Sequence, residues 1–137
     1  MPGSWILKTD ADNYDFDRLV RERRTMWDGV RNALALQHIR AMRRGDRALI
    51  YHSGAEKAIV GLARIASDPY PDPTAGDSKL AVVDVEAVRP LARPVTLATV
   101  KAERTLAELG LVRMSRLSVV PVSGAHWKRL MALAGEG

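Results

Sequence analysis

The segment at residues 46–66 has the sequence DRALIYHSGAEKAIVGLARIA, two apolar runs on either side of a short polar segment. The runs at residues 46–52 and 57–66 have the length and composition of strands. Between them, residues 53–56 contain a glycine and small polar residues, which is typical of a tight turn. The segment therefore predicts a β-hairpin.

Further strands and helices are predicted on both sides of this hairpin. Apolar or alternating patterns predict strands at residues 5–9, 80–88 and 114–119. The last of these would place Arg116 and Ser118 on one face, because strand side chains alternate. Segment 26–31 is predicted to be a loop or short strand, and the prolines predict a loop at 68–77 and a rigid connector at 89–94.

Helices are predicted where apolar spacing follows a capping residue or precedes a glycine. The N-cap residues are Asp15, Asn32 and Ser123, and the predicted helices span residues 16–23, 33–43, 96–102, 104–109 and 124–133. Strands and short helices thus alternate without regular βαβ spacing. This order predicts an α+β domain in which about five to six strands curl into a small β-barrel flanked by short helices.

Length and composition narrow the class of protein. The chain has 137 residues, 47% of them hydrophobic and 27% charged, which is typical of one compact domain, so we expect a single domain over residues 1–137. No apolar run approaches the roughly 18 residues that cross a bilayer. The N-terminus lacks the pattern of a signal peptide. We therefore expect no membrane partner and a cytoplasmic location, with association with the nucleoid as an alternative.

Positive charge is concentrated in one part of the sequence. The formal net charge is +5, and residues 18–47 hold nine arginines against three acidic residues. Such an excess favours a polyanionic partner, although a solvated basic face is an equal alternative on charge alone. Within this segment we expect phosphate contacts from Arg40, Arg43, Arg44 and Arg47.

Motifs of catalysis are absent from the sequence. It contains no phosphate-binding loop, dinucleotide-binding glycine motif, zinc-protease helix or nucleophile elbow. There is no cysteine, and the three histidines match no metal-binding spacing. His52 and Ser53 are adjacent on a predicted strand and would point to opposite faces, which argues against a catalytic pair. We therefore expect no enzymatic activity, no cofactor and no metal.

Three local clusters combine aromatic, arginine and small polar residues. They are residues 27–32 (WDGVRN), residues 51–53 (YHS) and residues 115–118 (SRLS). An indole, a glycine, a guanidinium and an amide are the groups with which a pocket stacks a planar base and bonds to its edge. Each cluster also has a purely structural interpretation, with Trp27 in the core, Asn32 as a helix cap and Arg116 as an exposed strand charge.

The order and spacing of these clusters resemble a known family. Together with WILK at 5–8, GDRALIYHS at 45–53, KAIVG at 57–61 and YPDPT at 70–74, they are similar to the EVE domain family over nearly the whole chain. The resemblance implies a PUA-like curled barrel with a non-catalytic pocket. In that family the pocket receives a modified base from DNA or RNA, such as 5-methylcytosine or another C5-modified cytosine.

The resemblance also implies which residues form the base-binding pocket. These are Lys8, Trp27, Gly29, Val30, Arg31, Asn32, Tyr51, His52, Ser53, Arg116, Leu117 and Ser118. The chain departs from the family pattern at residues 9–11, where TDA replaces Ser-Glu-Pro, and at Val120, where glutamine is common. These departures weaken the transfer of one particular ligand.

The leading hypothesis is thus a nucleic-acid-binding reader of one modified base. The alternative is a pocket for a free nucleotide or another small planar metabolite, which would bind with a shallow salt dependence. An enzyme acting on a modified base and a protein-interaction module are weaker alternatives. The sequence leaves open which modification is read, whether the polymer is DNA or RNA, and what the protein partners are.

Overall fold

The structure is a computed structural model that describes residues 3–136. Its elements, in chain order, are β1 (Ser4–Asp10), α1 (Phe16–Glu22), β2 (Arg24–Trp27), α2 (Ala33–Ala41), β3 (Arg47–Ser53), β4 (Ala58–Ile65), β5 (Tyr70–Pro71), β6 (Ala81–Thr96), α3 (Leu97–Ala102), the 3-10 helix η1 (Arg104–Leu106), α4 (Gly110–Arg113), β7 (Val119–Pro121) and α5 (Gly124–Leu133).

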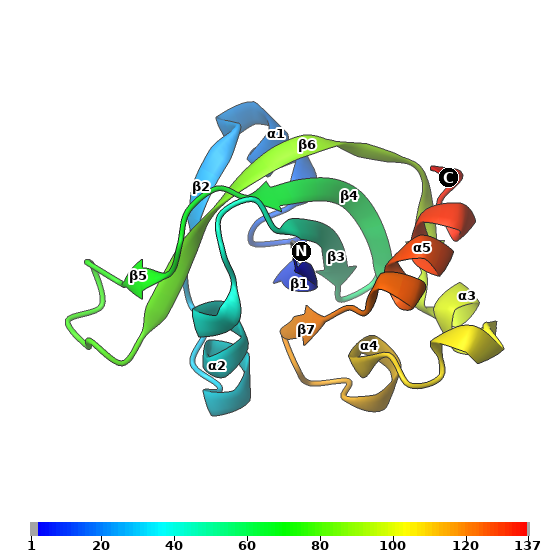
Figure 1. Cartoon of the computed structure of the whole chain (residues 1–137). Helices are drawn as coiled ribbons and strands as arrows, with labels where there is room; N and C mark the ends of the chain where they lie inside the picture. The colour runs from blue at the N-terminus through cyan, green and yellow to red at the C-terminus, as the bar shows by residue number, and fades with distance from the viewer. Residues whose placement is uncertain (1–2, 137) are drawn as a thin grey trace.

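One strongly curled sheet forms the centre of the molecule. Its strand order is β2-β6-β4-β3-β1-β7, and β5 pairs with β6 outside this path. β1 and β3 are parallel, and the other pairs are antiparallel. Figure 1 shows the sheet curving around β1 as a half-barrel, with the helices on its outside and at its open side. The predicted α+β class, with a curled sheet flanked by short helices, is confirmed.

Local sequence signals fix many of these elements. The predicted hairpin is confirmed as β3 and β4, with a bulge at residues 50–51. The three predicted N-caps are also confirmed, because Asp15, Asn32 and Ser123 each accept a hydrogen bond from a backbone N–H three residues later. Such a bond satisfies a backbone donor that would otherwise lack a partner in the first turn.

The rigid connector predicted at residues 89–94 is wrong, because β6 continues through it to Thr96. Pro90 lies opposite Gly61, where the register between β4 and β6 shifts. A proline has no N–H to give to a regular ladder, and an irregular position of this kind tolerates it. The result is a strand of 16 residues that pairs with β2, β4 and β5.

The strand predicted at residues 114–119 is also wrong. The chain forms helix α4 from Gly110, then a turn closed by a hydrogen bond from the Leu117 N–H to the Met114 carbonyl, and β7 begins only at Val119. Arg116 therefore lies in this turn and Ser118 in a bend just after it, so the two residues do not share one face of a strand. Gly110 begins a helix instead of ending one.

The core lies inside the curl and beneath the helices. Ile6 and Leu7 of β1 are fully buried between β3 and β7. Asp46 is a buried polar residue at the start of β3. Its carboxylate accepts hydrogen bonds from the Trp5 indole N–H at 2.9 Å and from the backbone N–H groups of Gly3 and Arg43 at 2.8 and 3.0 Å. These bonds fix the end of the sheet opposite to Lys8. Among the residues described, no helix has the length and apolar character needed to cross a membrane.

Candidate functional site

A cavity of about 190 Å³ opens between the C-terminal end of β1 and the edge strand β2. It is lined by Lys8, Thr9, Tyr14, Thr25, Met26, Trp27 and Asp28. Four of these residues, 25–28, are consecutive. Side chains on a strand alternate between the two faces of the sheet, so consecutive residues can line one cavity when it lies at the edge of the strand. The cavity therefore faces the open edge of β2, which among residues 3–136 pairs only with β6. Such an edge presents unpaired backbone N–H and C=O groups that could bond to the edge of a ligand.

Two aromatic side chains form a fixed wall of this cavity. The rings of Tyr14 and Trp27 meet edge to face, with centroids 6.2 Å apart. The Tyr14 hydroxyl donates a hydrogen bond to Glu22 at 2.7 Å, and the Arg18 guanidinium lies 4.9 Å from the Tyr14 ring centroid. Burial and the neighbouring Glu22 carboxylate raise the pKa of Tyr14, which therefore remains a neutral ring. Trp27 is only 8% exposed, so this wall is part of the packed structure.

Lys8 supplies the positive charge of the cavity. Its ammonium donates a hydrogen bond to the Ser115 carbonyl oxygen at 2.9 Å and lies 5.7 Å from the Tyr51 ring centroid. Partial burial lowers the pKa of Lys8, and burial raises the pKa of Tyr51. Tyr51 is 4% exposed and does not line the cavity. The structure thus places Tyr51 behind Lys8, while Tyr14 occupies the wall.

A second cavity of about 400 Å³ lies on the other side of the Lys8–Ser115 contact. It is lined by Asn32, Leu34, Arg113, Met114, Ser115, Arg116 and Leu117. Arg116 and Met114 are exposed at its rim, whereas Leu117 is buried. The backbone carbonyl of Ser118 accepts a hydrogen bond from the Lys8 N–H at 2.9 Å. This bond holds the 113–118 segment against the end of β1.

The loop between β2 and α2 joins the two cavities. Gly29 has a φ of 79°, a left-handed conformation that favours glycine, and the loop ends at Asn32, the cap of α2. Val30 is buried, and the Arg31 side chain is exposed. The charge of Arg31 is felt at Asp72. Hydrogen bonds from Thr74 are the main cause of the lowered pKa of Asp72, and the positive charge of Arg31 lowers this pKa further. The fold therefore brings Lys8 and the 27–32 and 115–118 clusters together.

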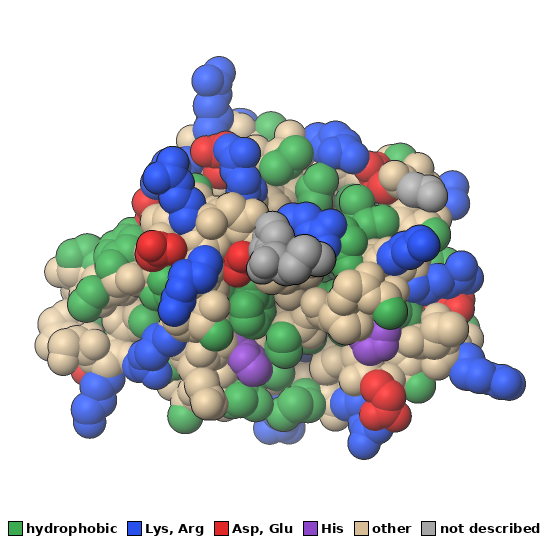
Figure 2. Space-filling view, in the orientation of Figure 1, with side chains coloured by type: hydrophobic (Ala, Val, Ile, Leu, Met, Phe, Trp, Pro, Cys, Tyr) green, Lys and Arg blue, Asp and Glu red, His purple; other side chains and the backbone are tan. Residues whose placement is uncertain are grey.

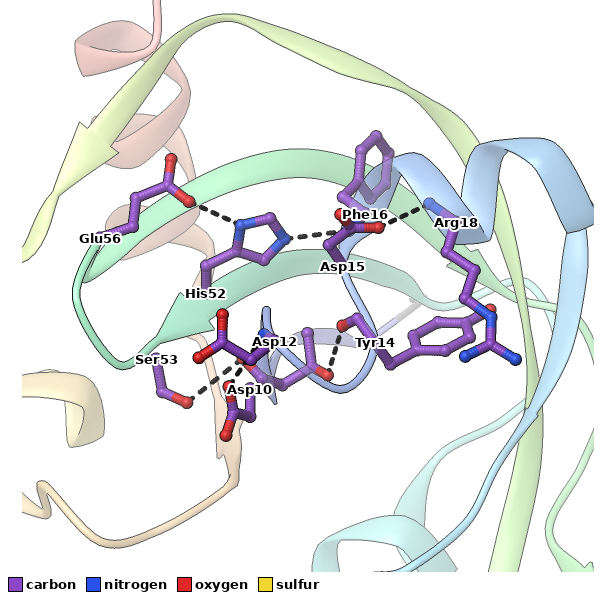
Figure 3. Close-up of polar contacts among 10 residues, drawn as sticks. Asp10, Asp12, Tyr14, Asp15, Phe16, Arg18, His52, Ser53 and Glu56 are labelled. Atoms are coloured by element: carbon purple, nitrogen blue, oxygen red, sulfur yellow. Dashed lines mark hydrogen bonds and ion pairs between the residues drawn. The ribbon is translucent and has the colours of Figure 1, made fainter.

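His52 and Ser53 instead hold the segment between β1 and α1 (Figure 3). The His52 Nε2 accepts a hydrogen bond from the Phe16 N–H at 2.9 Å, so its Nδ1 carries the proton that reaches Glu56 at 2.7 Å. The Ser53 hydroxyl donates to the Thr9 carbonyl oxygen at 3.2 Å. His52 lines a different cavity, beside Asp15 and Phe16. Neither residue reaches the cavity next to Trp27.

The structure does not gather the four predicted phosphate-binding arginines at this cavity. Arg47 stacks on Trp127, with its guanidinium carbon 4.3 Å from the ring centroid, and pairs with Ser4, at the far end of β1 from Lys8. At about 3.3 Å per strand residue, Lys8 is roughly 13 Å along the strand from Ser4. Arg44 lines a separate cavity between Arg24 and Arg64. Figure 2 shows Lys and Arg side chains scattered over one face among acidic and apolar ones.

Arg40 and Arg43 contact the backbone around α2. Arg40 donates a hydrogen bond to the Lys79 carbonyl oxygen, and Arg43 donates to the carbonyl oxygens of Arg40 and Met42. Phosphate contacts by the four arginines remain predictions.

Several residues that line the cavity were not among the site residues predicted from the sequence. Tyr14, Thr25 and Met26 belong to no chemical motif, and the sequence singles out Thr9 only as a departure from the family pattern. They come together only because the end of β1 approaches β2. Asp28 lies within the 27–32 cluster, where an aspartate before a glycine is typical of a turn and gives no sign of a ligand contact. Within residues 3–136, no group of three or more His, Asp or Glu side chains is arranged to hold a metal ion.

Comparisons with known proteins agree with this geometry. The EVE domain family model matches residues 4–133. Thymocyte nuclear protein 1 from Gallus gallus is 31% identical over an alignment that covers 96% of this chain and 69% of that protein. The NMR structure of Rpa0253 from Rhodopseudomonas palustris has a TM-score of 0.92 and 45% identity, covering 97% of this chain and 93% of that one. The human THYN1 protein, in a crystal structure with 5-methylcytosine-containing DNA, has a TM-score of 0.90 and 26% identity, covering 98% and 99%.

Proposed function

Because the chain belongs to the EVE domain family, we propose that it binds nucleic acid and accommodates one modified base, with 5-methylcytosine in DNA as the first candidate. The observation that carries the proposal is the cavity beside Trp27. It lies in a fold shared with the human THYN1 protein, whose crystal structure contains 5-methylcytosine DNA. The chain acts as a reader, binding the base without turnover.

The size of the cavity supports a single base as its ligand. Pockets for drug-sized molecules measure roughly 300–1,000 Å³, whereas this one measures about 190 Å³. A complete nucleotide would therefore leave its sugar and phosphate outside. Removing a base from a duplex costs a few kcal/mol, so a single strand binds more tightly than a duplex.

Different residues of the cavity and its rim make different contacts with the ligand. Trp27 and Tyr14 supply aromatic surface, and stacking on such surface contributes about 1–3 kcal/mol per base. Met26 supplies an apolar contact for a 5-methyl group. Lys8 donates to acceptors on the base, and the exposed Arg116 is placed to contact the phosphates next to it.

The experiment is a fluorescence-polarisation titration of oligonucleotides that carry cytosine or 5-methylcytosine at one position, as single strands and duplexes, at two salt concentrations. We expect the modified single strand to bind best. Lys8→Met and Arg116→Ala should each lower the affinity about 5-fold or more. Arg129→Ala is the matched control, because it removes the same charge from α5 and lies outside both cavities.

Three results would contradict the proposal. Equal binding of every strand, unchanged in Lys8→Met and Arg116→Ala, would reduce the interaction to a generic basic surface. Binding of free 5-methyldeoxycytidine as tight as that of the oligonucleotide, with a shallow salt slope, would replace it with a metabolite pocket. Conversion of the modified base, detected by mass spectrometry of the recovered strand, would indicate an enzyme.

A further inference from the structure

Asp28 is the acidic residue among those that line the cavity, and Lys8 is the basic one. The other polar side-chain groups of the lining are the hydroxyls of Thr9, Tyr14 and Thr25 and the indole N–H of Trp27, and the Thr9 hydroxyl already donates to the Tyr14 carbonyl oxygen at 2.7 Å. Among the lining side chains, Asp28 thus only accepts hydrogen bonds, whereas Lys8 and Trp27 only donate them. This polarity restricts which base edges fit.

The Asp28 carboxylate is free to take up such a role. Asp15 caps α1, and Asp84 accepts bonds from Tyr70 and Arg24. Asp28, by contrast, is exposed and has no side-chain hydrogen bond or ion pair to any residue between 3 and 136. It follows Trp27 at the end of β2 and precedes Gly29, whose left-handed φ turns the chain away. The carboxylate is therefore held at the rim of the cavity by a conformation that does not depend on it.

We propose that Asp28 makes the cavity selective for pyrimidines with a 4-amino group, by accepting a hydrogen bond from that group. The inference rests on the proposed function. Cytosine and 5-methylcytosine present an amino donor next to two acceptors, N3 and O2, which matches Asp28 on one side and Lys8 on the other. Thymine and uracil present a 4-keto oxygen to the carboxylate, and two acceptors that face each other repel.

Adenine is the informative competitor, because it also carries an amino group next to a ring acceptor. It has two rings, however, and the fixed edge-to-face pair of Tyr14 and Trp27 bounds one side of the cavity. We expect the shape of the cavity to favour the smaller pyrimidine over adenine, and Asp28 to disfavour thymine. The 5-methyl group is read separately by apolar contact, so it does not enter this choice.

The test uses single strands in which one base lies between abasic spacers, so that no neighbouring base competes. The variable base is 5-methylcytosine, thymine, cytosine or adenine. The first two share the methyl group and differ only at the 4-position and N3. We expect the wild-type protein to prefer 5-methylcytosine over thymine by about 5- to 150-fold. Asp28→Asn should bring this ratio close to one, because an amide both donates and accepts.

Asp17→Asn is the matched control. It removes the same charge from α1, where Asp17 is exposed and lines a different cavity, and it should keep the wild-type ratio. Thermal melts of both variants check that they fold. If Asp28→Asn keeps the preference for 5-methylcytosine over thymine, the role of Asp28 is overturned. Adenine binding equal to 5-methylcytosine overturns the restriction to pyrimidines.

These failures differ from failure of the proposed function. If no base binds more tightly than an oligonucleotide made only of spacers, the cavity reads no base at all, and both proposals are wrong. If cytosine and 5-methylcytosine bind equally but both exceed thymine, Asp28 acts as inferred and the reading of the methyl group is wrong.

Discussion

Gly61 lies directly beneath the ring of Phe16, and the structure leaves no room there for a side chain. A Cβ atom at Gly61 would lie 2.4 Å from two carbons of the Phe16 ring. Favourable carbon–carbon contacts are about 3.5–4.0 Å, so the ring would have to move by about 1 Å. Phe16 is 3% exposed and begins α1, so the ring is enclosed and cannot swing into solvent.

We predict that Gly61→Ala lowers the free energy of unfolding by roughly 1–2 kcal/mol. Overpacking costs about 1–3 kcal/mol, and an overlap of about 1 Å with an enclosed ring belongs in the upper half of that range. The smaller backbone entropy of an unfolded chain with alanine offsets about 0.5–1 kcal/mol. For a domain of this size, that loss lowers the Tm by roughly 3–10 °C. The measurement is a urea denaturation curve together with a thermal melt.

Two further variants make the result specific. Gly124→Ala is the matched control, because no atom of the described residues other than its chain neighbours lies within 4 Å of a Cβ there. Alanine also favours the start of α5, so the Tm of this variant should stay equal or rise. In the double variant Gly61→Ala with Phe16→Leu, the smaller side chain relieves the overlap, and the combined loss should be smaller than the sum of the two single losses. A Gly61→Ala protein as stable as wild type, or strictly additive losses, would refute the packing argument.

Two other predictions concern buried and shifted polar groups. Asp46→Ala should cost at least about 3 kcal/mol in urea denaturation, since the Trp5 indole N–H and two backbone N–H groups lose their acceptor; a loss below 1 kcal/mol would contradict this. Burial, followed by the hydrogen bond to Asp84, raises the pKa of Tyr70 from 10.0 to about 12. The wild type should therefore lose more stability than Tyr70→Phe between pH 10 and pH 12, whereas parallel curves of unfolding free energy against pH would contradict the shift.

Local signals in the sequence predicted much of the fold. The hairpin and the capped helices depend on neighbours within a few residues, such as Asn32 and the backbone N–H of Ala35. The errors arose where distant segments decide the structure. β6 continues through Pro90 because this proline lies opposite Gly61, at an irregular position of the pairing between β4 and β6. No local pattern in the sequence indicates that pairing. At residues 114–118 the sequence alternates as a strand would, but the chain forms a turn that follows α4.

The candidate site was predictable only in part, for the same reason. Lys8 and Trp27 meet at one cavity, and the 115–118 cluster adjoins it through Lys8. Tyr14 could not be predicted there, because its place depends on how β1 and β2 approach each other. Arg47 is the last residue of the predicted basic segment, yet the direction of β3 carries it to the end of the sheet away from Tyr51, the strand partner of Lys8.

The position of β1 in the sheet has a consequence for how the protein is made. β1 lies between β3 and β7, and it pairs with β7 across about 110 residues of chain, as in Leu7 with Val119. At a synthesis rate of about 5–20 residues per second, β7 leaves the ribosome roughly 6–20 s after β1. During that interval the newly made chain exposes an open apolar edge, which is a template for wrong pairing. β7, the last strand of this sheet in chain order, therefore closes β1, the first, and the nascent sheet stays incomplete until residues 119–121 have been translated.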